Sequence, residues 1–226
     1  MSASLSRRCF AEFISTFCLI LMGCGAMAVD SRTGSLTHVG VATVWGLVVM
    51  VMIYAVGSIS GAHMNPAVTI AFAVQRRMPV RDAVVYIPAQ CAGALCAALA
   101  IRSVLGLDSS MLGATSVQLD LSPLSGVAIE AMMTTILMFV VMGVSTGAME
   151  ESVTAGLAVG ATIAIEAFVA GPLTKASMNP ARSFGPAVAS SDVSELWIYF
   201  VGPIAGALIG AALYGLTQES QTQPDG

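Results

Sequence analysis

Apolar residues in this chain form long, nearly continuous stretches that polar residues interrupt only at intervals. A helix of about 20 apolar residues is long enough to cross the hydrocarbon core of a bilayer. Windows near this length occur at residues 9–29, 39–58, 83–105, 125–148, 154–171 and 196–216. The first of them is too long for a signal-peptide core and contains Glu12, so we interpret it as a retained span. The pattern therefore predicts an all-α membrane protein with six transmembrane helices.

Two shorter apolar segments follow the motifs Asn65-Pro66-Ala67 and Asn179-Pro180-Ala181. Asparagine is a favoured N-cap residue, and proline fits the first turn of a helix, so each motif predicts a helix start. Neither segment is long enough to cross a bilayer, and each follows a loop, which predicts two re-entrant half-helices. Backbone N–H groups at membrane depth are tolerated only where they face protein or water. The two motifs therefore indicate a pore or binding site near the bilayer midplane.

The two halves of the chain also match away from these motifs. Glu12 and Glu130 lie early in the first span of each half, at similar distances before the two asparagines. Three spans in each half require that the halves have opposite orientations, so the half-helices enter from opposite sides. We predict one transmembrane domain over residues 1–226, with repeats at about 8–105 and 125–216. Inverted repeats occur in channels and in carriers, so the repeat alone leaves that choice open.

Charge adds the orientation and excludes several classes of protein. Of the 226 residues, 56% are hydrophobic and 10% are charged, whereas a soluble domain needs roughly a quarter charged residues. The net charge of −4 and the lack of a basic patch argue against a nucleic-acid partner. Arginine is enriched in cytoplasmic loops. Both termini are therefore expected in the cytoplasm, because this places five arginines on that side: Arg7, Arg8, Arg76, Arg77 and Arg81.

Catalytic and metal chemistry find no support in the sequence. Two histidines make no metal cluster, and the five cysteines lie in apolar runs without metal-ligand spacing. No nucleophile–base arrangement and no HExxH motif is present, so an enzyme is not expected and no cofactor is implied. A proton- or ion-coupled carrier remains an alternative, disfavoured because no paired carboxylates or basic relay accompany the motifs.

The two Asn-Pro-Ala motifs, with Arg182 after the second, resemble the major intrinsic protein (aquaporin) family from about Arg8 to Leu216. Several short sequence stretches are most similar to the nodulin-26-like branch of this family. The short N- and C-terminal tails look like those of a compact bacterial relative. The stretches that carry this likeness are Trp45-Gly46-Leu47, Ile59-Ser60-Gly61-Ala62-His63 and Ala170-Gly171-Pro172. The resemblance implies a homotetramer in the cell (inner) membrane, with one pore per subunit. It also implies a passive channel for small neutral solutes and water that excludes ions and protons.

The resemblance assigns the selectivity filter to Trp45, Ala167, Ala176 and Arg182. Water-selective members have phenylalanine and histidine at the first two positions, so this filter is expected to be wider and less polar. Glycerol-type polyols are the implied solutes, with urea, arsenous acid and boric acid as further candidates. Ser183, Ala187 and the pair Tyr199-Phe200 are more similar to water channels. Strict water selectivity therefore remains the alternative within this family.

Three further residues are implied to support the pore. Glu12 and Glu130 are expected to accept hydrogen bonds from the loops that hold the half-helices, although a carrier would use such carboxylates as proton relays. His63 is expected to fix a loop carbonyl or to line the pore. An ion pair between Arg182 and Glu130 or Glu166 is the structural alternative to a filter role for that arginine.

Overall fold

The computed structural model describes residues 3–106, 112–145 and 154–218, and within these ranges every regular element is a helix. Six of the helices are long and apolar enough to cross a membrane, which confirms the predicted all-α fold with six spans. Residues 146–148 of the predicted span 125–148 lie outside the described ranges. The helices in chain order are α1 (Leu5–Thr33), α2 (Thr37–Ser60), α3 (Pro66–Val74), α4 (Val80–Leu105), α5 (Pro123–Val144), α6 (Ala155–Thr174), α7 (Pro180–Ser190) and α8 (Ile198–Leu216).

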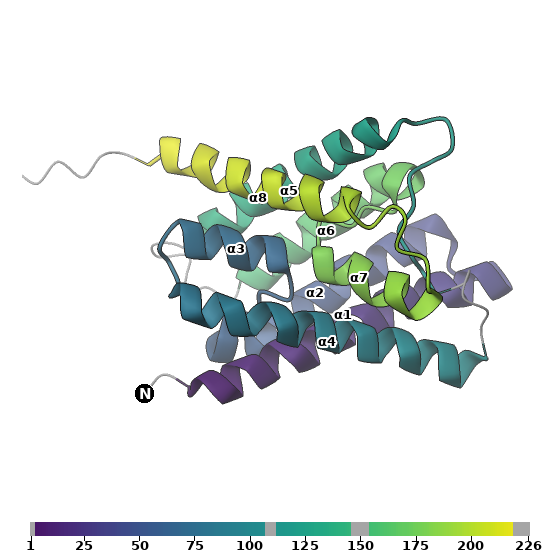
Figure 1. The fold of residues 1–226 in the computed structure, drawn as a ribbon, viewed down its shortest axis with the longest axis horizontal. Helices are drawn as coiled ribbons and strands as arrows, with labels where there is room; N and C mark the ends of the chain where they lie inside the picture. Colours follow the sequence, from purple (N-terminus) through teal and green to yellow (C-terminus); the bar gives the residue numbers. More distant parts are fainter. Residues whose placement is uncertain (1–2, 107–111, 146–153, 219–226) are drawn as a thin grey trace, which may run out of the picture.

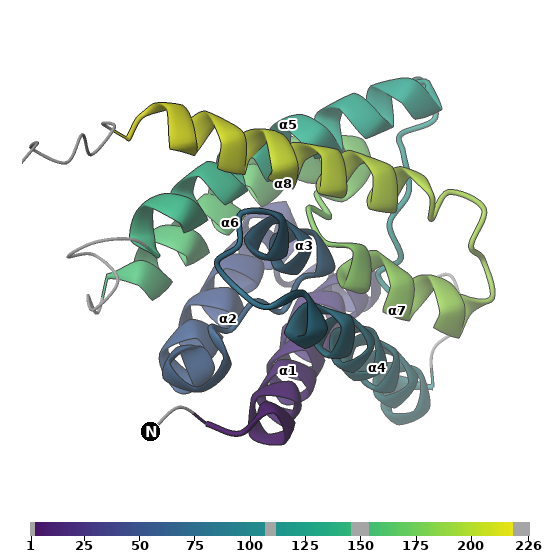
Figure 2. The ribbon, with the colours of Figure 1, turned by 60° about the vertical axis from the view of Figure 1, so that its left-hand side comes forward.

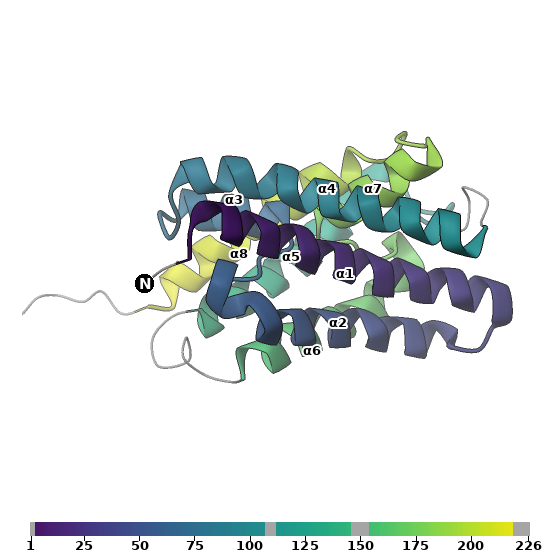
Figure 3. The ribbon, with the colours of Figure 1, turned by 90° about the horizontal axis from the view of Figure 1, so that it is seen from below.

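The six long helices surround the two short ones. Helices α1, α2 and α4 lie on one side of the molecule and α5, α6 and α8 on the other, with α3 and α7 between them (Figure 2). Figure 3 shows α4, α1 and α2 from the side of the first group. The two groups meet directly where α2 packs on α6, and α3 and α7 each contact both α4 and α8. The short helices therefore fill the opposite side of the bundle.

Helices α3 and α7 lie end to end in the middle of the molecule, with their N-termini facing each other (Figure 1). The start of α1 and the end of α8 lie at the same end of the bundle in this view, as an even number of spans requires. The two short helices occur where the two Asn-Pro-Ala motifs predict them. Each consequently presents its unpaired N–H groups at the centre of the molecule rather than at a surface.

Close packing between the long helices depends on glycine. A Cβ atom at Gly93 of α4 would overlap the carbonyl oxygen of Phe13 on α1. A Cβ atom at Gly206 of α8 would overlap the carbonyl oxygen of Ala131 on α5. Small residues at such crossings let two backbones approach closely, which is how helices associate where lipid removes the hydrophobic driving force.

We expect Gly206→Ala to destabilise the folded protein by about 1–3 kcal/mol, the usual cost of forcing a methylene into a packed interface. Gly215→Ala is the matched control on the same helix, because a Cβ atom there would meet nothing within 4 Å. Thermal unfolding in detergent, followed by size-exclusion chromatography, should show a lower midpoint for Gly206→Ala only. Equal midpoints for the two variants would contradict this account of the α5–α8 contact.

Candidate functional site

The site begins with the two asparagines that cap the short helices. The side-chain Oδ1 of Asn65 accepts a hydrogen bond of 2.9 Å from the backbone N–H of Ala67. The Oδ1 of Asn179 accepts bonds from the N–H groups of Ala181, at 2.9 Å, and Arg182, at 3.2 Å. Pro66 and Pro180 occupy the first helical positions, where no N–H is needed. Both helices thus begin as the sequence predicts.

Each asparagine also reaches across to the opposite loop. The Nδ2 of Asn65 donates to the carbonyl oxygen of Met178 at 2.8 Å, and the Nδ2 of Asn179 donates to that of Met64 at 2.7 Å. These reciprocal bonds join residues that are far apart in the sequence and fix the two helix starts against each other. A side-chain amide has two N–H donors, so each asparagine keeps one N–H beyond its cross-loop bond.

Glu12 holds the loop before α3. Its side chain is fully buried in α1. One carboxylate oxygen accepts bonds from the Ser60 hydroxyl, at 2.7 Å, and the His63 N–H, at 2.9 Å. The other accepts bonds from the Met64 N–H, at 2.7 Å, and the Gln90 side chain, at 2.8 Å. Four donors therefore converge on one carboxylate, an arrangement that compensates for its burial.

Glu130 holds the second loop in nearly the same way. Its carboxylate accepts bonds from the Thr174 hydroxyl, at 2.7 Å, and from the N–H groups of Ser177 and Met178, at 3.0 and 2.7 Å. A tyrosine hydroxyl completes this set, since Tyr199 donates to the carbonyl oxygen of Thr174 at 3.0 Å. The equivalent bond in the first half runs from Tyr86 to Ser60, also at 3.0 Å. Each loop is therefore anchored by one carboxylate and one tyrosine.

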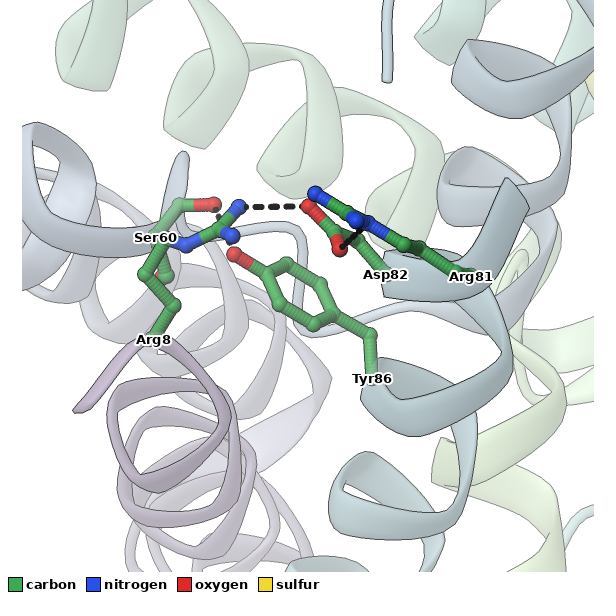
Figure 4. Close-up of polar contacts among 5 residues, drawn as sticks. All are labelled: Arg8, Ser60, Arg81, Asp82 and Tyr86. Carbon is green, nitrogen blue, oxygen red and sulfur yellow. Dashed lines mark hydrogen bonds and ion pairs between the residues drawn. The ribbon is translucent and has the colours of Figure 1, made fainter. Parts of the chain in front are cut away.

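Tyr86 links the first loop to a charged cluster on α1 and α4 (Figure 4). Arg8 of α1 forms an ion pair of 2.9 Å with the buried carboxylate of Asp82 on α4, and the exposed Arg81 lies 3.4 Å from the same carboxylate. The Arg8 guanidinium lies 6.0 Å from the centre of the Tyr86 ring. The cluster therefore braces α1 against α4 beside the tyrosine that holds the Ser60 carbonyl.

The backbone of both loops is strained at matching positions. Ala62 and Met64 have φ values of 49° and 51°, and Ala176 and Met178 have values of 45° and 54°. Such left-handed conformations cost a non-glycine residue about 1–2 kcal/mol. They persist where surrounding bonds over-determine them. The hydrogen bonds from the Met64 N–H to Glu12 and from the Met178 N–H to Glu130 hold the two loops in this conformation.

Arg182 is buried one turn into α7, with 2% of its surface exposed. Its Nη1 donates to the carbonyl oxygen of Gly113 at 2.7 Å, and two sulfur atoms lie close by: Cys24 Sγ at 3.6 Å from Nη1 and Met27 Sδ at 3.2 Å from Nη2. The centre of the Trp45 ring lies 4.6 Å from the guanidinium carbon, a cation–π contact. In the described part of the chain, Arg182 makes no ion pair, so pairing with Glu130 or Glu166 is not what the structure shows.

A cavity of about 1000 Å³ connects these parts. It extends from Arg77, just after α3, past both asparagines to the four residues that the sequence assigns to the filter. His63 lines it as well. Its ring bonds the Thr69 hydroxyl at 3.0 Å rather than a loop carbonyl, and it stacks on Phe72. Seven of the predicted site residues line this one cavity: Trp45, His63, Asn65, Ala167, Ala176, Asn179 and Arg182. Glu12 and Glu130 are not among the lining residues but bond loop residues that are.

Several residues that hold the two loops or Arg182 in place are not predicted from the sequence. Ser60 and Thr174 each stand five residues before a capping asparagine, a match that could have identified them. Gln90 donates both to Glu12 and to Thr69, and a glutamine within an apolar span is a signal in itself. Nothing in the local sequence indicates that the Gly113 carbonyl would bond Arg182. Among described residues, no cluster could hold a metal ion, and neither carboxyl oxygen of Glu166 has a hydrogen-bond partner.

Comparisons with known proteins identify a matching family, similar sequences and a similar fold. The family model described as "Major intrinsic protein" matches residues 1–214. Aquaporin NIP1-1 of Oryza sativa subsp. japonica is 46% identical over 217 residues, which cover 95% of this chain and 75% of that protein. Aquaporin NIP1-2 of Arabidopsis thaliana is 42% identical over 224 residues, with coverages of 96% and 76%. The X-ray structure of the aquaglyceroporin from Plasmodium falciparum matches with a TM-score of 0.85 and 25% identity, covering 95% of this chain and 97% of that one.

We expect Glu130→Gln to loosen the second loop. The amide NH₂ would replace an acceptor that now faces N–H groups, and a buried donor left unpaired costs about 1–3 kcal/mol. Osmotic water flux per assembled protein in proteoliposomes, together with the unfolding midpoint, should therefore fall. Asp120→Asn is the matched control, because it removes the same charge from an exposed side chain. Wild-type flux and midpoint in Glu130→Gln would show that the carboxylate does not hold the loop.

Proposed function

The chain belongs to the major intrinsic protein family, a family of transport channels rather than enzymes, and we propose that it passively conducts glycerol-type polyols together with water. As a member of that family it is a multi-pass integral membrane protein and a channel for water and small solutes. The proposal adds the solute class and the exclusion of ions and protons. Urea, boric acid and arsenous acid are neutral molecules of similar size, and they are the further candidate solutes.

The observation that carries the proposal is the composition of the cavity wall around Arg182. Trp45 offers a flat apolar face, while Ala167 and Ala176 occupy little space at the same cavity. Arg182 faces this wall with a guanidinium, whose N–H groups bond hydroxyl oxygens. A polyol has a carbon backbone on one side and hydroxyl groups on the other, so this two-sided wall suits it. Asn65 and Asn179 offer further N–H donors at the middle of the cavity.

Exclusion of ions follows from the charges that face the same cavity. The N-termini of α3 and α7, capped by Asn65 and Asn179, carry the positive ends of two helix dipoles and face each other in the middle of the molecule (Figure 1). A cation entering from either side would approach this positive region, and Arg182 adds a full positive charge. Protons would be excluded because donors at the centre orient passing water molecules in opposite directions, which interrupts a hydrogen-bonded water chain.

Strict water selectivity is the second candidate, and the pair Tyr199-Phe200 is one of the sequence features that favour it. Tyr199 is fully buried, and its hydroxyl holds the Thr174 carbonyl. Tyr199 therefore supports the second loop, and its identity does not distinguish a water-selective channel from a polyol channel. The alanines at positions 167 and 176 favour the polyol.

For the organisation of the channel we propose one transmembrane domain built from inverted repeats at about 8–105 and 125–216. We further propose a homotetramer in the inner membrane of a bacterial cell, with both termini cytoplasmic. Large apolar side chains exposed on α2, α5 and α6 could contact lipid or neighbouring subunits, as at Leu47, Ile136 and Ile165. Arginine enrichment near the start of α1 and between α3 and α4 supports the orientation.

Stopped-flow light scattering on proteoliposomes tests the proposed function directly. We expect rapid osmotic water flux and a protein-dependent glycerol flux well above that of empty liposomes. An internal pH dye should report no added proton flux under a pH gradient. High water flux without glycerol flux would favour the water-selective candidate. Uphill accumulation of solute that collapses with an uncoupler would instead favour a coupled carrier.

We expect Ala167→His combined with Trp45→Phe to shift the channel toward water. The imidazole would fill space that Ala167 leaves open, and the smaller ring would change the apolar face. A changed steric or hydrogen-bonding fit alters a barrier by about 1–3 kcal/mol, or roughly 10–200-fold in rate. Glycerol flux should therefore fall by much more than water flux, with each single variant measured as a control. An unchanged glycerol-to-water ratio in an assembled double variant would mean that Ala167 does not line the constriction.

A further inference from the structure

The indole ring of Trp45 packs directly against the backbone of α1 at Gly23. A Cβ atom built on Gly23 would overlap three atoms of that ring, Cε3, Cζ3 and Cη2. The ring occupies the volume that any side chain at position 23 would need. Gly23 lies inside a regular helix and its φ is not positive, so the backbone conformation there does not demand glycine. Glycine is required at position 23 because the tryptophan ring occupies the volume that a side chain would need.

The same ring also borders the cavity. Trp45 lines it and is 8% exposed, and the Arg182 guanidinium carbon lies 4.6 Å from the centre of the ring. The ring therefore stands between the backbone of α1 and the contents of the cavity. Its distance from α1 sets how much room remains beside Arg182.

We propose that Gly23 is a specificity-determining residue: by leaving space for the Trp45 ring against α1, it sets the width of the filter and thereby the size of solute that passes. This inference rests on the proposed function of Trp45 as a wall of the filter. Gly23 touches no solute itself and acts through the position of the tryptophan.

A side chain at position 23 has few other ways to be accommodated. Moving α1 away from α2 would disturb its contact with α4, where Gly93 lies against the Phe13 carbonyl. The ring, in contrast, belongs to a side chain that borders the cavity and the Arg182 guanidinium, so it can shift toward them without moving a helix. Gly23→Ala should therefore push the indole ring into the cavity and narrow the passage for a polyol more than for water.

Gly25 provides a matched control two residues further along α1. A Cβ atom at Gly25 would meet nothing within 4 Å. Gly25→Ala makes the same chemical change in the same helix, with the same gain in helix propensity, but without a collision. A difference between the two variants therefore reports the contact with Trp45 and not a general effect on α1.

The experiment measures glycerol and water flux in proteoliposomes for wild type, Gly23→Ala and Gly25→Ala, each with Trp45 and with Trp45→Val. We expect Gly23→Ala to lower the ratio of glycerol flux to water flux by about tenfold or more. Tenfold is the low end of the effect that one extra methyl group has on the fit of a substrate. Gly25→Ala should change the ratio by less than about twofold. Gly23→Ala should have almost no further effect in the Trp45→Val background, because a valine lacks the overlapping ring atoms; such coupling is what a double-mutant cycle detects.

Fluorescence gives a second readout that reports the ring itself. The chain has two tryptophans, so Trp197→Phe leaves Trp45 as the sole tryptophan, whose emission is excited selectively over that of tyrosine at long wavelength. In that background Gly23→Ala should shift the emission and the acrylamide quenching of Trp45, whereas Gly25→Ala should leave both unchanged. A loss of overall stability alone would not reproduce this pattern.

Three results would overturn the inference. The first is an equal glycerol-to-water ratio in Gly23→Ala and Gly25→Ala when the wild type conducts glycerol. The second is a Gly23→Ala effect of full size in the Trp45→Val background. The third is a wild type without glycerol flux, which contradicts the proposed function as well and is recognised from the unmutated protein. If Gly23→Ala does not assemble, its combination with Trp45→Val replaces it: assembly restored by the valine supports the contact with the ring. Failure of that double variant to assemble, when Trp45→Val alone does assemble, would count against the inference.

Discussion

Two buried carboxylates are the constraint on which the rest of this structure depends. A helix that begins in the middle of a membrane protein brings unpaired N–H groups and a loop to a depth where water cannot satisfy them freely. Glu12 and Glu130 supply the acceptors, each bonding two consecutive loop N–H groups and a hydroxyl. Both carboxylates are fully buried, and the N–H and O–H donors around them compensate for the loss of contact with water. The bonds stabilise the charge and the loop at the same time.

The geometry at the centre follows from these anchors. With the loops fixed in a left-handed backbone at Met64 and Met178, the carbonyl of each methionine meets the amide of the opposite asparagine. The asparagines then cap their helices with Oδ1 and keep one N–H each for a passing molecule. The proposed function uses this arrangement together with Arg182, which is held by the Gly113 carbonyl and by the Trp45 ring. The contacts that hold the two loops in place are thus the same ones that position the groups facing the proposed solute path.

The sequence predicts most of this fold because its strongest signals are physical necessities. Spans must be long and apolar, and helix starts at depth need caps, so both features are visible without a structure. The helices extend past the predicted windows where their ends are polar, as α1 does from Leu5 to Thr33. What could not be predicted is contact between distant segments. The hydrogen bond from Arg182 to Gly113 and the closeness of Arg182 to Cys24 depend on tertiary packing that no local motif encodes. The same holds for the contact between Gly23 and Trp45.

The most direct test of the central claim is a structure of the protein in lipid nanodiscs at a resolution that shows ordered water. The account predicts a single file of water through the cavity, with a water molecule at the centre that accepts hydrogen bonds from Asn65 Nδ2 and Asn179 Nδ2. Glu12 and Glu130 should bond the same loop N–H groups as here. A file of water that bypasses the asparagines, or a centre that is dry while the protein conducts, would contradict it.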